Sequence, residues 1–354
     1  MARIKVLVVD DSFFTRKRLI DMLVSDPDIE VIDIAQDGLE AVEKVTKLDP
    51  DVVTLDIEMA KMDGLTALDH IMKDHPVPVI MVSTLTEKGS EATVRALMRG
   101  AVDFIHKPTD LAHVTFSQIK DELIAKVKAA AKAKLKTRVQ SAPIATTTIE
   151  SDFRLSAARN KLVMIGSSTG GPRALVEVLP RLPKNFPSPI VIVQHMPPGP
   201  FIKSIAKRLE ADSNIRVEEA YNDARLEPGV ALMAPGGYHV LVEKGGVIKL
   251  SQGPAVNAVR PSVDVMMSSG AAIFGQNSIG VILTGMGHDG ANGMALIKKK
   301  GGYTIAEHES TCVVYGMPKS VVENGDADAI VPLEQVSQEI IRAIERENHA
   351  KLCG

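Results

Sequence analysis

A serine in the middle of the chain lies in a segment whose residue types suit nucleophilic chemistry. An apolar run, residues 162–165, ends in Gly166-Ser167-Ser168-Thr169-Gly170, which fits the G-x-S-x-G spacing that exposes a serine on a sharp strand-to-helix turn. Pro172 then opens a helical pattern, and the free N–H groups at the start of such a helix suit an oxyanion. The same pattern is also typical of a Gly-rich turn that binds phosphate, so this motif alone leaves both functions open.

Two further residues supply what a serine nucleophile needs. His195 and Asp289 lie just beyond two other predicted buried strands, residues 189–193 and 278–283. Parallel strands end at one edge of a sheet, so we expect both side chains to lie near Ser168. Histidine can take the serine proton, and a buried carboxylate can orient the imidazole and stabilise its charged form. The backbone N–H groups of Thr169 and Met286 are our candidates for the oxyanion site.

Other histidines and one other aspartate compete for these roles. His239, which leads into a predicted hairpin, His288, which adjoins the proposed acid, and His308, which follows a strand without a glycine opening, are alternative bases. Asp264 is the alternative acid. We favour His195, because it follows a buried strand of the same sheet. The order Ser, His, Asp differs from the order Ser, Asp/Glu, His of α/β-hydrolases, which argues against an ordinary lipase or esterase.

A second group of reactive side chains follows predicted strand ends in the first third of the chain. Its members are Asp10, Asp11, Asp56, Ser83 and Lys107. Three carboxylates at one edge repel each other unless a cation joins them, and a hard divalent cation such as Mg²⁺ fits oxygen ligands. One carboxylate can then attack a phosphoryl group, while the lysine and the serine hydroxyl hold the transferred oxygens. The alternative is that each aspartate caps a helix and the lysine only pairs with one of them.

Both groups depend on strands that alternate with helices. In the first part we expect strands at residues 4–9, 31–35, 51–55, 77–82 and 101–105. In the second we expect strands at residues 162–165, 189–193, 230–234, 278–283 and 302–306, and a hairpin at residues 240–242 and 247–250. The fold class is therefore α/β, with two doubly wound domains. The N-terminal domain is expected to be flavodoxin-like, and the C-terminal one a mostly parallel α/β/α domain with an antiparallel edge hairpin.

Length and composition allow this organisation and exclude several other classes. The chain has 354 residues, enough for two domains. Its net charge of −3, its 3% aromatic content and its lack of tryptophan argue against nucleic-acid binding. Two cysteines make neither a disulfide framework nor a zinc site. We find no signal peptide and no apolar run long enough to span a bilayer, so we expect a cytoplasmic protein without membrane insertion.

The first constellation resembles the receiver domain of two-component response regulators over residues 1–122. The resemblance implies that Asp56 is the phospho-acceptor. It also implies that Asp10, Asp11, Asp56 and the backbone carbonyl of Glu58 bind Mg²⁺. The supporting residues would be Ser83 as the hydroxyl switch residue, Phe104 as the aromatic switch residue and Lys107 as the lysine before proline. A histidine kinase would be the phosphodonor. A lysine-rich helical extension and linker, residues 123–155, would separate this domain from a catalytic domain at residues 156–350; the linker itself is placed at residues 140–152.

The second constellation resembles chemotaxis protein-glutamate methylesterases of the CheB type. The matching segments are residues 165–171, 194–196, 234–237, 260–264 and 283–287. The resemblance implies a methylesterase and glutamine deamidase with catalytic Ser168, His195 and Asp289 and no cofactor in the catalytic domain. Its substrates would be the methyl-accepting chemotaxis receptors, with Arg260 a candidate contact to their acidic helices or an ordinary surface ion-pair partner.

Together these inferences predict a hydrolase that phosphorylation switches on for adaptation in chemotaxis. We expect the unphosphorylated receiver domain to cover the edge that carries Ser168, and phosphorylation of Asp56 to loosen that cover. Two alternatives stay open. In the first, the second domain is a binding module without catalytic activity that binds, for example, DNA, although no helix-turn-helix pattern or basic stripe supports this. The chain could also be a generic serine hydrolase that acts on small esters.

Overall fold

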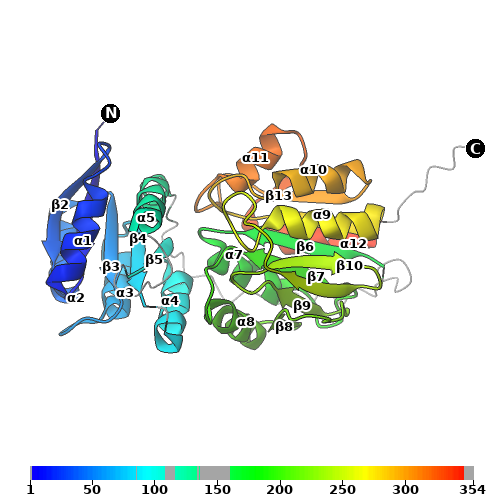
Figure 1. The fold of residues 1–354 in the computed structure, drawn as a ribbon, viewed down its shortest axis with the longest axis horizontal. Helices are drawn as coiled ribbons and strands as arrows, with labels where there is room; N and C mark the ends of the chain where they lie inside the picture. The colour runs from blue at the N-terminus through cyan, green and yellow to red at the C-terminus, as the bar shows by residue number, and fades with distance from the viewer. Residues whose placement is uncertain (1, 85, 108–115, 134, 136–159, 347–354) are drawn as a thin grey trace, which may run out of the picture. The chain divides into compact units, whose positions relative to one another are not determined.

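The computed structural model describes residues 2–84, 86–107, 116–133, 135 and 160–346 (Figure 1). The chain divides into two compact units, Met1–Ile144 and Ala145–Gly354, which are described separately below. The predicted linker at residues 140–152 lies outside the described residues, as do Cys353 and the boundary between the two units. The three predicted domain ranges therefore stay predictions.

The first unit contains a parallel sheet of five strands in the order β2-β1-β3-β4-β5. In chain order the strands are β1 (Ile4–Val9), β2 (Ile29–Ala35), β3 (Val52–Asp56), β4 (Val79–Ser83) and β5 (Asp103–His106). The central strands β3 and β4 are buried along their whole length, as expected of strands that helices cover on both faces. All five predicted strands are present, and each begins and ends within two residues of its predicted bounds.

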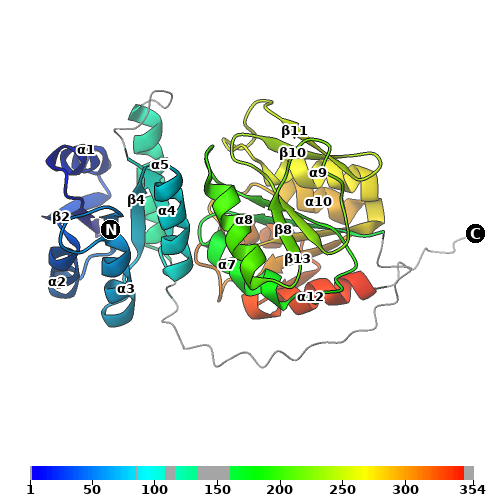
Figure 2. The same cartoon turned by 90° about the horizontal axis from the view of Figure 1, so that it is seen from below.

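Within the described residues, five helices cover this sheet. They are α1 (Phe13–Leu23), α2 (Gly38–Leu48), α3 (Gly64–Asp74), α4 (Glu87–Arg99) and α5 (Phe116–Ala130). Helices α1 and α5 pack together on one face, and α2, α3 and α4 on the other (Figures 1 and 2). The first four each begin at an N-cap residue whose side chain accepts a hydrogen bond from a backbone N–H of the first turn; these residues are Ser12, Asp37, Asp63 and Thr86. These N-caps satisfy donors that a helix start leaves free, and they fix where each helix leaves its strand.

The second unit contains a parallel sheet of seven strands in the order β14-β13-β12-β6-β7-β9-β8. In chain order these are β6 (Leu162–Ser167), β7 (Ile190–Gln194), β8 (Arg216–Glu219), β9 (Val230–Met233), β12 (Ser278–Ile282), β13 (Tyr303–Glu307) and β14 (Ala329–Val331). The sequence analysis did not predict β8 and β14, which form the two edges. The predicted hairpin, β10 (His239–Glu243) and β11 (Val247–Ser251), forms a two-stranded sheet of its own, because other strands already occupy both edges.

Helices cover both faces of this sheet as well. Helices α7 (Gly171–Val178), α8 (Phe201–Asp212) and α12 (Leu333–Glu345) lie on one face; α9 (Val263–Phe274), α10 (Ala291–Lys299) and α11 (Met317–Glu323) lie on the other (Figures 1 and 2). The start of α9 lies directly against the end of β6: a Cβ atom at Gly166 would be only 2.4 Å from Val263 Cγ1. Glycine at this position therefore allows the N-terminus of α9 to approach the turn that carries Ser168.

Across the described residues we find no helix with both the length and the apolar character that crossing a membrane requires.

Candidate functional sites

Ser168 lies in the turn between β6 and α7. The strand ends at Ser167 and the helix begins at Gly171, after Gly170 with a φ of 78°, a left-handed conformation that favours glycine. The Ser168 N–H donates to the Thr284 carbonyl at 3.0 Å, and the Ser168 carbonyl accepts from the Gly171 N–H at 2.8 Å. The turn is therefore fixed through its backbone, and the Ser168 side chain stays partly exposed.

Gln194, the last residue of β7, cross-links the serine turn to the loop that carries His195. Its Nε2 donates to the carbonyls of Ser168 at 3.0 Å and His195 at 3.1 Å, and its Oε1 accepts from Ser167 Oγ at 2.7 Å. The His195 N–H also donates to the Ser167 carbonyl at 3.0 Å. The two loops are thus adjacent, although no hydrogen bond between the Ser168 hydroxyl and the His195 ring is present among the described residues. The sequence analysis missed this role of Gln194.

His195 and Asp289 form a buried pair. His195 Nε2 lies 2.8 Å from Asp289 Oδ2, and the side chains are 11% and 4% exposed. A carboxylate can only accept, so Nε2 carries the proton and donates it to Asp289. In the neutral ring, Nδ1 is then the nitrogen with a free electron pair. This arrangement leaves Nδ1 able to take up a proton.

Asp289 accepts hydrogen bonds from several other groups. Oδ2 also accepts from the Val263 N–H at 2.6 Å, and Oδ1 accepts from Ser262 Oγ and Asn257 Nδ2, both at 2.8 Å. Burial alone would raise the pKa of this carboxyl group. The hydrogen bond and charge of His195, together with the bonds from Asn257 and Ser262, outweigh burial and lower the pKa to about 2. Asp289 is therefore ionised at neutral pH.

The alternative acid, Asp264, shares Asn257 with Asp289 but otherwise has its own partners. Its Oδ1 accepts from the Gly293 N–H at 2.8 Å, and its Oδ2 accepts from the side-chain amides of Asn257 at 2.9 Å and Asn292 at 3.1 Å. Among the described residues, no histidine ring is hydrogen-bonded to it. Asp264 caps the N-terminus of α10 and does not orient a base.

The alternative bases also have other partners. The buried His239 bonds through Nε2 to the Pro254 carbonyl at 3.0 Å, and its Nδ1 accepts from the Ser262 N–H at 3.2 Å. His308 Nδ1 is bonded to Ser310, and His288 is exposed. In the described part of the chain, His195 is the histidine that contacts Asp289.

The predicted oxyanion donors and the predicted substrate contact stay predictions. Thr169 is buried, with its carbonyl accepting from Thr284 Oγ1 at 3.0 Å, and Met286 is 38% exposed. Arg260 Nη1 donates to the carbonyls of Gln252 at 2.9 Å and Gly253 at 2.8 Å. Part of the Arg260 guanidinium group is therefore used inside its own loop.

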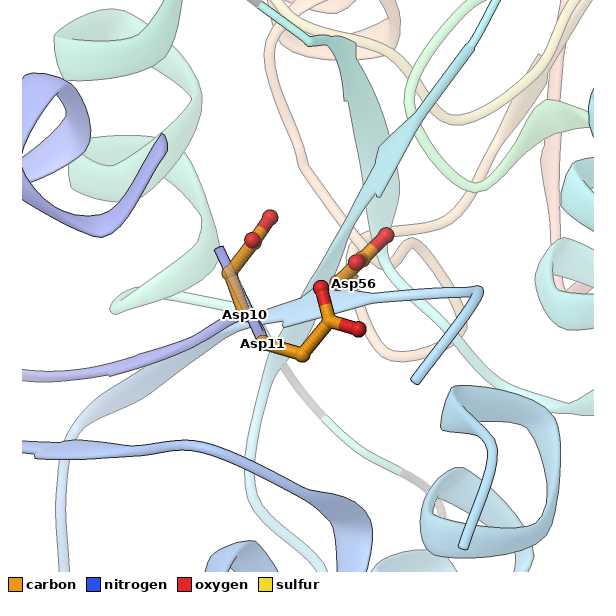
Figure 3. Close-up of side chains that lie close together, drawn as sticks. All are labelled: Asp10, Asp11 and Asp56. Atoms are coloured by element: carbon orange, nitrogen blue, oxygen red, sulfur yellow. The ribbon is translucent and has the colours of Figure 1, made fainter. Parts of the chain in front are cut away.

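The first unit brings Asp10, Asp11 and Asp56 together at the carboxyl edge of its sheet (Figure 3). One oxygen from each carboxylate lies within 4.8 Å of the others. Lys107 Nζ donates to Asp56 Oδ2 at 2.7 Å and lies 3.3 Å from Asp10 Oδ2. One ammonium group thus contacts two of the three carboxylates. This oxygen donor set with excess negative charge fits a hard divalent cation.

The charge imbalance changes the acidity of the buried carboxyl groups. Burial, together with the negative charge of Asp10, raises the pKa of Asp56 to about 6, although Lys107 opposes the shift. Burial also raises the pKa of Asp10. Glu58 donates its backbone N–H to Asp56 Oδ1 at 3.3 Å, so it lies beside the cluster where its carbonyl is predicted to bind the cation.

The predicted switch residues lie on neighbouring strands. Ser83 ends β4, where its hydroxyl accepts from Thr93 Oγ1 at 2.6 Å and donates to the Gly89 carbonyl at 3.3 Å. Phe104, in β5, is buried, and Lys126 Nζ lies 5.1 Å from the centre of its ring. The Ser83 hydroxyl is therefore oriented toward α4 in this structure.

Comparison with known proteins agrees with this division. Residues 163–340 match the family model for CheB methylesterase, and residues 6–116 match that for the response regulator receiver domain. A Pyrococcus abyssi protein named protein-glutamate methylesterase/protein-glutamine glutaminase is 47% identical, covering 97% of this chain and 94% of its own length. A Symbiobacterium thermophilum protein of the same name is 49% identical, with 96% and 97% covered. The crystal structure of the Thermotoga maritima CheB methylesterase catalytic domain matches with a TM-score of 0.50 and 48% identity, covering 51% of this chain and 97% of that one.

Proposed function

Since this chain belongs to the CheB methylesterase family, we propose that one Ser-His-Asp site removes methyl groups from glutamate side chains and deamidates glutamine side chains. The observation that carries the proposal is the 2.8 Å contact between His195 Nε2 and Asp289 Oδ2, beside the turn of Ser168. The substrates are the methylation segments of methyl-accepting chemotaxis receptors, and the enzyme acts on them in the cytoplasm.

The reaction is an acyl transfer in two steps. Ser168 Oγ attacks the side-chain carbonyl carbon while His195 Nδ1 takes the serine proton, and Asp289 stabilises the imidazolium that forms. The backbone N–H groups of Thr169 and Met286 receive the negative oxygen of the tetrahedral intermediate. His195 returns its proton to the leaving group, which departs as methanol from an ester or as ammonia from an amide.

Hydrolysis of the acyl-enzyme completes the cycle. His195 takes a proton from water as the water oxygen attacks the acyl carbon, and the proton then passes to Ser168 Oγ as the bond to serine breaks. Both substrates give a glutamate side chain. A single site therefore serves both reactions, because they share one acyl-enzyme.

The first unit regulates this reaction as a phosphorylated receiver. Asp56 accepts the phosphoryl group from a histidine kinase. Asp10, Asp11, Asp56 and the Glu58 carbonyl would hold Mg²⁺, which would supply positive charge beside the transferred group. Lys107 and the Ser83 hydroxyl bind phosphoryl oxygens, and Ser83 and Phe104 change position as the receiver switches. Unphosphorylated, the receiver restrains the hydrolase; phosphorylated, it releases the restraint.

The test is methanol release from methyl-labelled receptor membranes, with and without Mg²⁺ and a small acyl-phosphate donor. We expect release by the full chain to rise with the donor and Ser168→Ala to release none. In Asp56→Asn the basal rate should remain and the rise should disappear. If the serine variant releases methanol at the wild-type rate, the catalytic assignment is wrong. If Asp56→Asn still responds to the donor, the phospho-acceptor assignment is wrong.

A further inference from the structure

The N-termini of α9 and α10 are each capped by a carboxylate from the other segment. Asp289, two residues before α10, accepts from the N–H of Val263, the first residue of α9, at 2.6 Å. Asp264, in the first turn of α9, accepts from the N–H of Gly293 in α10 at 2.8 Å. This reciprocal capping brings two buried carboxylates close together, and like charges repel each other unless donors are shared between them.

Asn257 is shared between the two carboxylates. Its Nδ2 donates to Asp264 Oδ2 at 2.9 Å and to Asp289 Oδ1 at 2.8 Å. An amide nitrogen carries two hydrogens, so each carboxylate receives one. In the described residues no other side chain donates to both. Asn257 therefore bridges the charge that orients His195 and the charge that caps α10.

A tight turn holds Asn257 in place. Val256 and Val259 pair through two backbone hydrogen bonds of 3.0 and 3.1 Å. Between them Asn257 and Ala258 have φ values of 54° and 63°, as in the type I′ turn of a two-residue hairpin. Asparagine tolerates this left-handed conformation better than most residues. The turn can therefore hold the amide with little backbone strain at this position.

The loop around this turn is anchored on both sides. Arg260 Nη1 donates to the carbonyls of Gln252 and Gly253, and His239 is bonded to the Pro254 carbonyl. The Gly237 N–H also donates to the Arg260 carbonyl at 3.1 Å. These bonds fix residues 252–260 relative to the start of α9. They give Arg260 and His239 a structural role in holding the Asn257 turn.

We infer that Asn257 is a positioning residue of the hydrolase, acting through Asp289; this rests on the proposed function. It holds Asp289 Oδ1 so that Oδ2 remains aligned with His195 Nε2, and its shared hydrogens keep Asp289 ionised beside Asp264. Asn257 has no contact with the reacting serine among the described residues. Its loss should therefore lower the rate of the chemical step and leave substrate binding unchanged.

Two substitutions test whether Asn257 acts as a hydrogen-bond donor to Asp289 or only fills space beside it. Asn257→Asp keeps the shape and tolerates the left-handed backbone, but replaces the donor with an acceptor. Asn257→Gly removes the side chain and also tolerates the backbone. Hydrogen bonds to charged groups are strong enough that we expect kcat of both variants in the full chain to fall about tenfold or more, with KM unchanged. Ala258→Gly, in the same turn, is the matched control and should keep wild-type kcat.

The outcomes are distinct. If Asn257→Asp keeps wild-type kcat and only Asn257→Gly loses it, Asn257 fills space and the inference is overturned. The inference is also overturned if both variants keep wild-type kcat and only their KM rises. A readout independent of substrate is the downfield proton resonance of the His195–Asp289 hydrogen bond, which we expect to shift or broaden in Asn257→Asp and to stay unchanged in Ala258→Gly; an unchanged resonance in Asn257→Asp contradicts the inference. Absence of methanol release by the wild type would contradict the proposed function, whereas the resonance would still test Asn257.

Discussion

Asp56 and Asp289 are both buried at the carboxyl edge of a parallel sheet, and both contact a basic side chain, yet their pKa values move in opposite directions. Burial and the charge of Asp10 raise the pKa of Asp56 to about 6. For Asp289 burial acts in the same direction, but His195, Asn257 and Ser262 lower the pKa to about 2. Burial alone therefore does not decide the acidity of a carboxyl group; the donors and the charges around it decide the direction of the pKa shift.

This difference indicates two kinds of functional site. Around Asp289 the donors belong to the chain itself and include the Val263 N–H at the start of α9, so this carboxylate has its hydrogen-bond partners before substrate arrives. Around Asp56, Lys107 contacts two of three clustered carboxylates, which leaves an excess of negative charge that a divalent cation from solution would balance. We describe the first as a preorganised site and the second as a site that needs its ligand.

The largest effect should come from removing the charge of the preorganised site. We expect Asp289→Asn to lower kcat/KM for methanol release by roughly 10³-fold or more, because an amide neither fixes the ring as Asp289 does nor stabilises its charged form. Asp264→Asn is the control: it changes an equally buried carboxylate that contacts no histidine among the described residues, and should lose far less activity. Equal losses in the two variants would mean that the helix caps, not the orientation of His195, limit the reaction.

Removing divalent cations should have a large effect on the site of Asp56 and none on the site of Asp289. We expect chelation of divalent cations to abolish phosphorylation of Asp56 by a small acyl-phosphate donor and to leave basal hydrolysis unchanged. Asp11→Asn should weaken Mg²⁺ binding about tenfold or more, because a ligand carboxylate is lost from a site with an oxygen donor set. Titration of Mg²⁺ against the phosphorylated fraction measures this. A fall in basal hydrolysis on chelation would contradict the division into two kinds of site.

The strand ends explain how much of both sites could be predicted. Buried strands such as β3 and β7 are short, mostly apolar segments, and a polar residue at or just after the end of each lies at the sheet edge. This rule identified His195 and Asp289, which are in contact. It did not reveal β8 or β14, because an edge strand such as Arg216–Glu219 is partly exposed and polar, and Ala329–Val331 has only three residues.

The donors around Asp289 could not be predicted in the same way. Asn257 lies 32 residues from Asp289 in the chain, and its contact depends on a turn of two left-handed residues. Gln194 directly precedes His195, yet its role depends on how close β6 and β7 bring two loops. The available signal for Asn257 was an asparagine at the first of two positions between Val256 and Val259, as in a tight hairpin turn. Hydrogen bonds between loops depend on packing that a pattern in one segment does not contain.

The smallest effect we predict is on stability, and it should have opposite pH dependence at the two sites. The folded-state pKa of Asp56 lies above its ordinary value of 3.8. Its contribution to the free energy of unfolding is therefore most favourable below about pH 4 and is lost as pH rises through about 6. Asp56→Asn should therefore stabilise the cation-free first unit at pH 7 by on the order of 2–3 kcal/mol, and by much less at pH 4. Added Mg²⁺ should reduce the gain, because the wild type binds the cation more tightly.

For Asp289 the sign is reversed. Its folded-state pKa of about 2 lies below the ordinary value of 3.8. The stabilising contribution of Asp289 to the free energy of unfolding is therefore present above about pH 4 and is lost as pH falls toward 2. Asp289→Asn should therefore destabilise the second unit at pH 7, by on the order of 2 kcal/mol, and the difference from wild type should shrink in acid. Thermal unfolding of the full-length variants against pH, in the presence of a chelator, measures both effects. If both variants shift stability in the same direction at pH 7, the hydrogen-bond donors around Asp56 and Asp289 do not distinguish the two sites. Opposite shifts would tie the acidity of each carboxyl group to what surrounds it: a set of donors built into the chain for Asp289, and a cation still to be bound for Asp56.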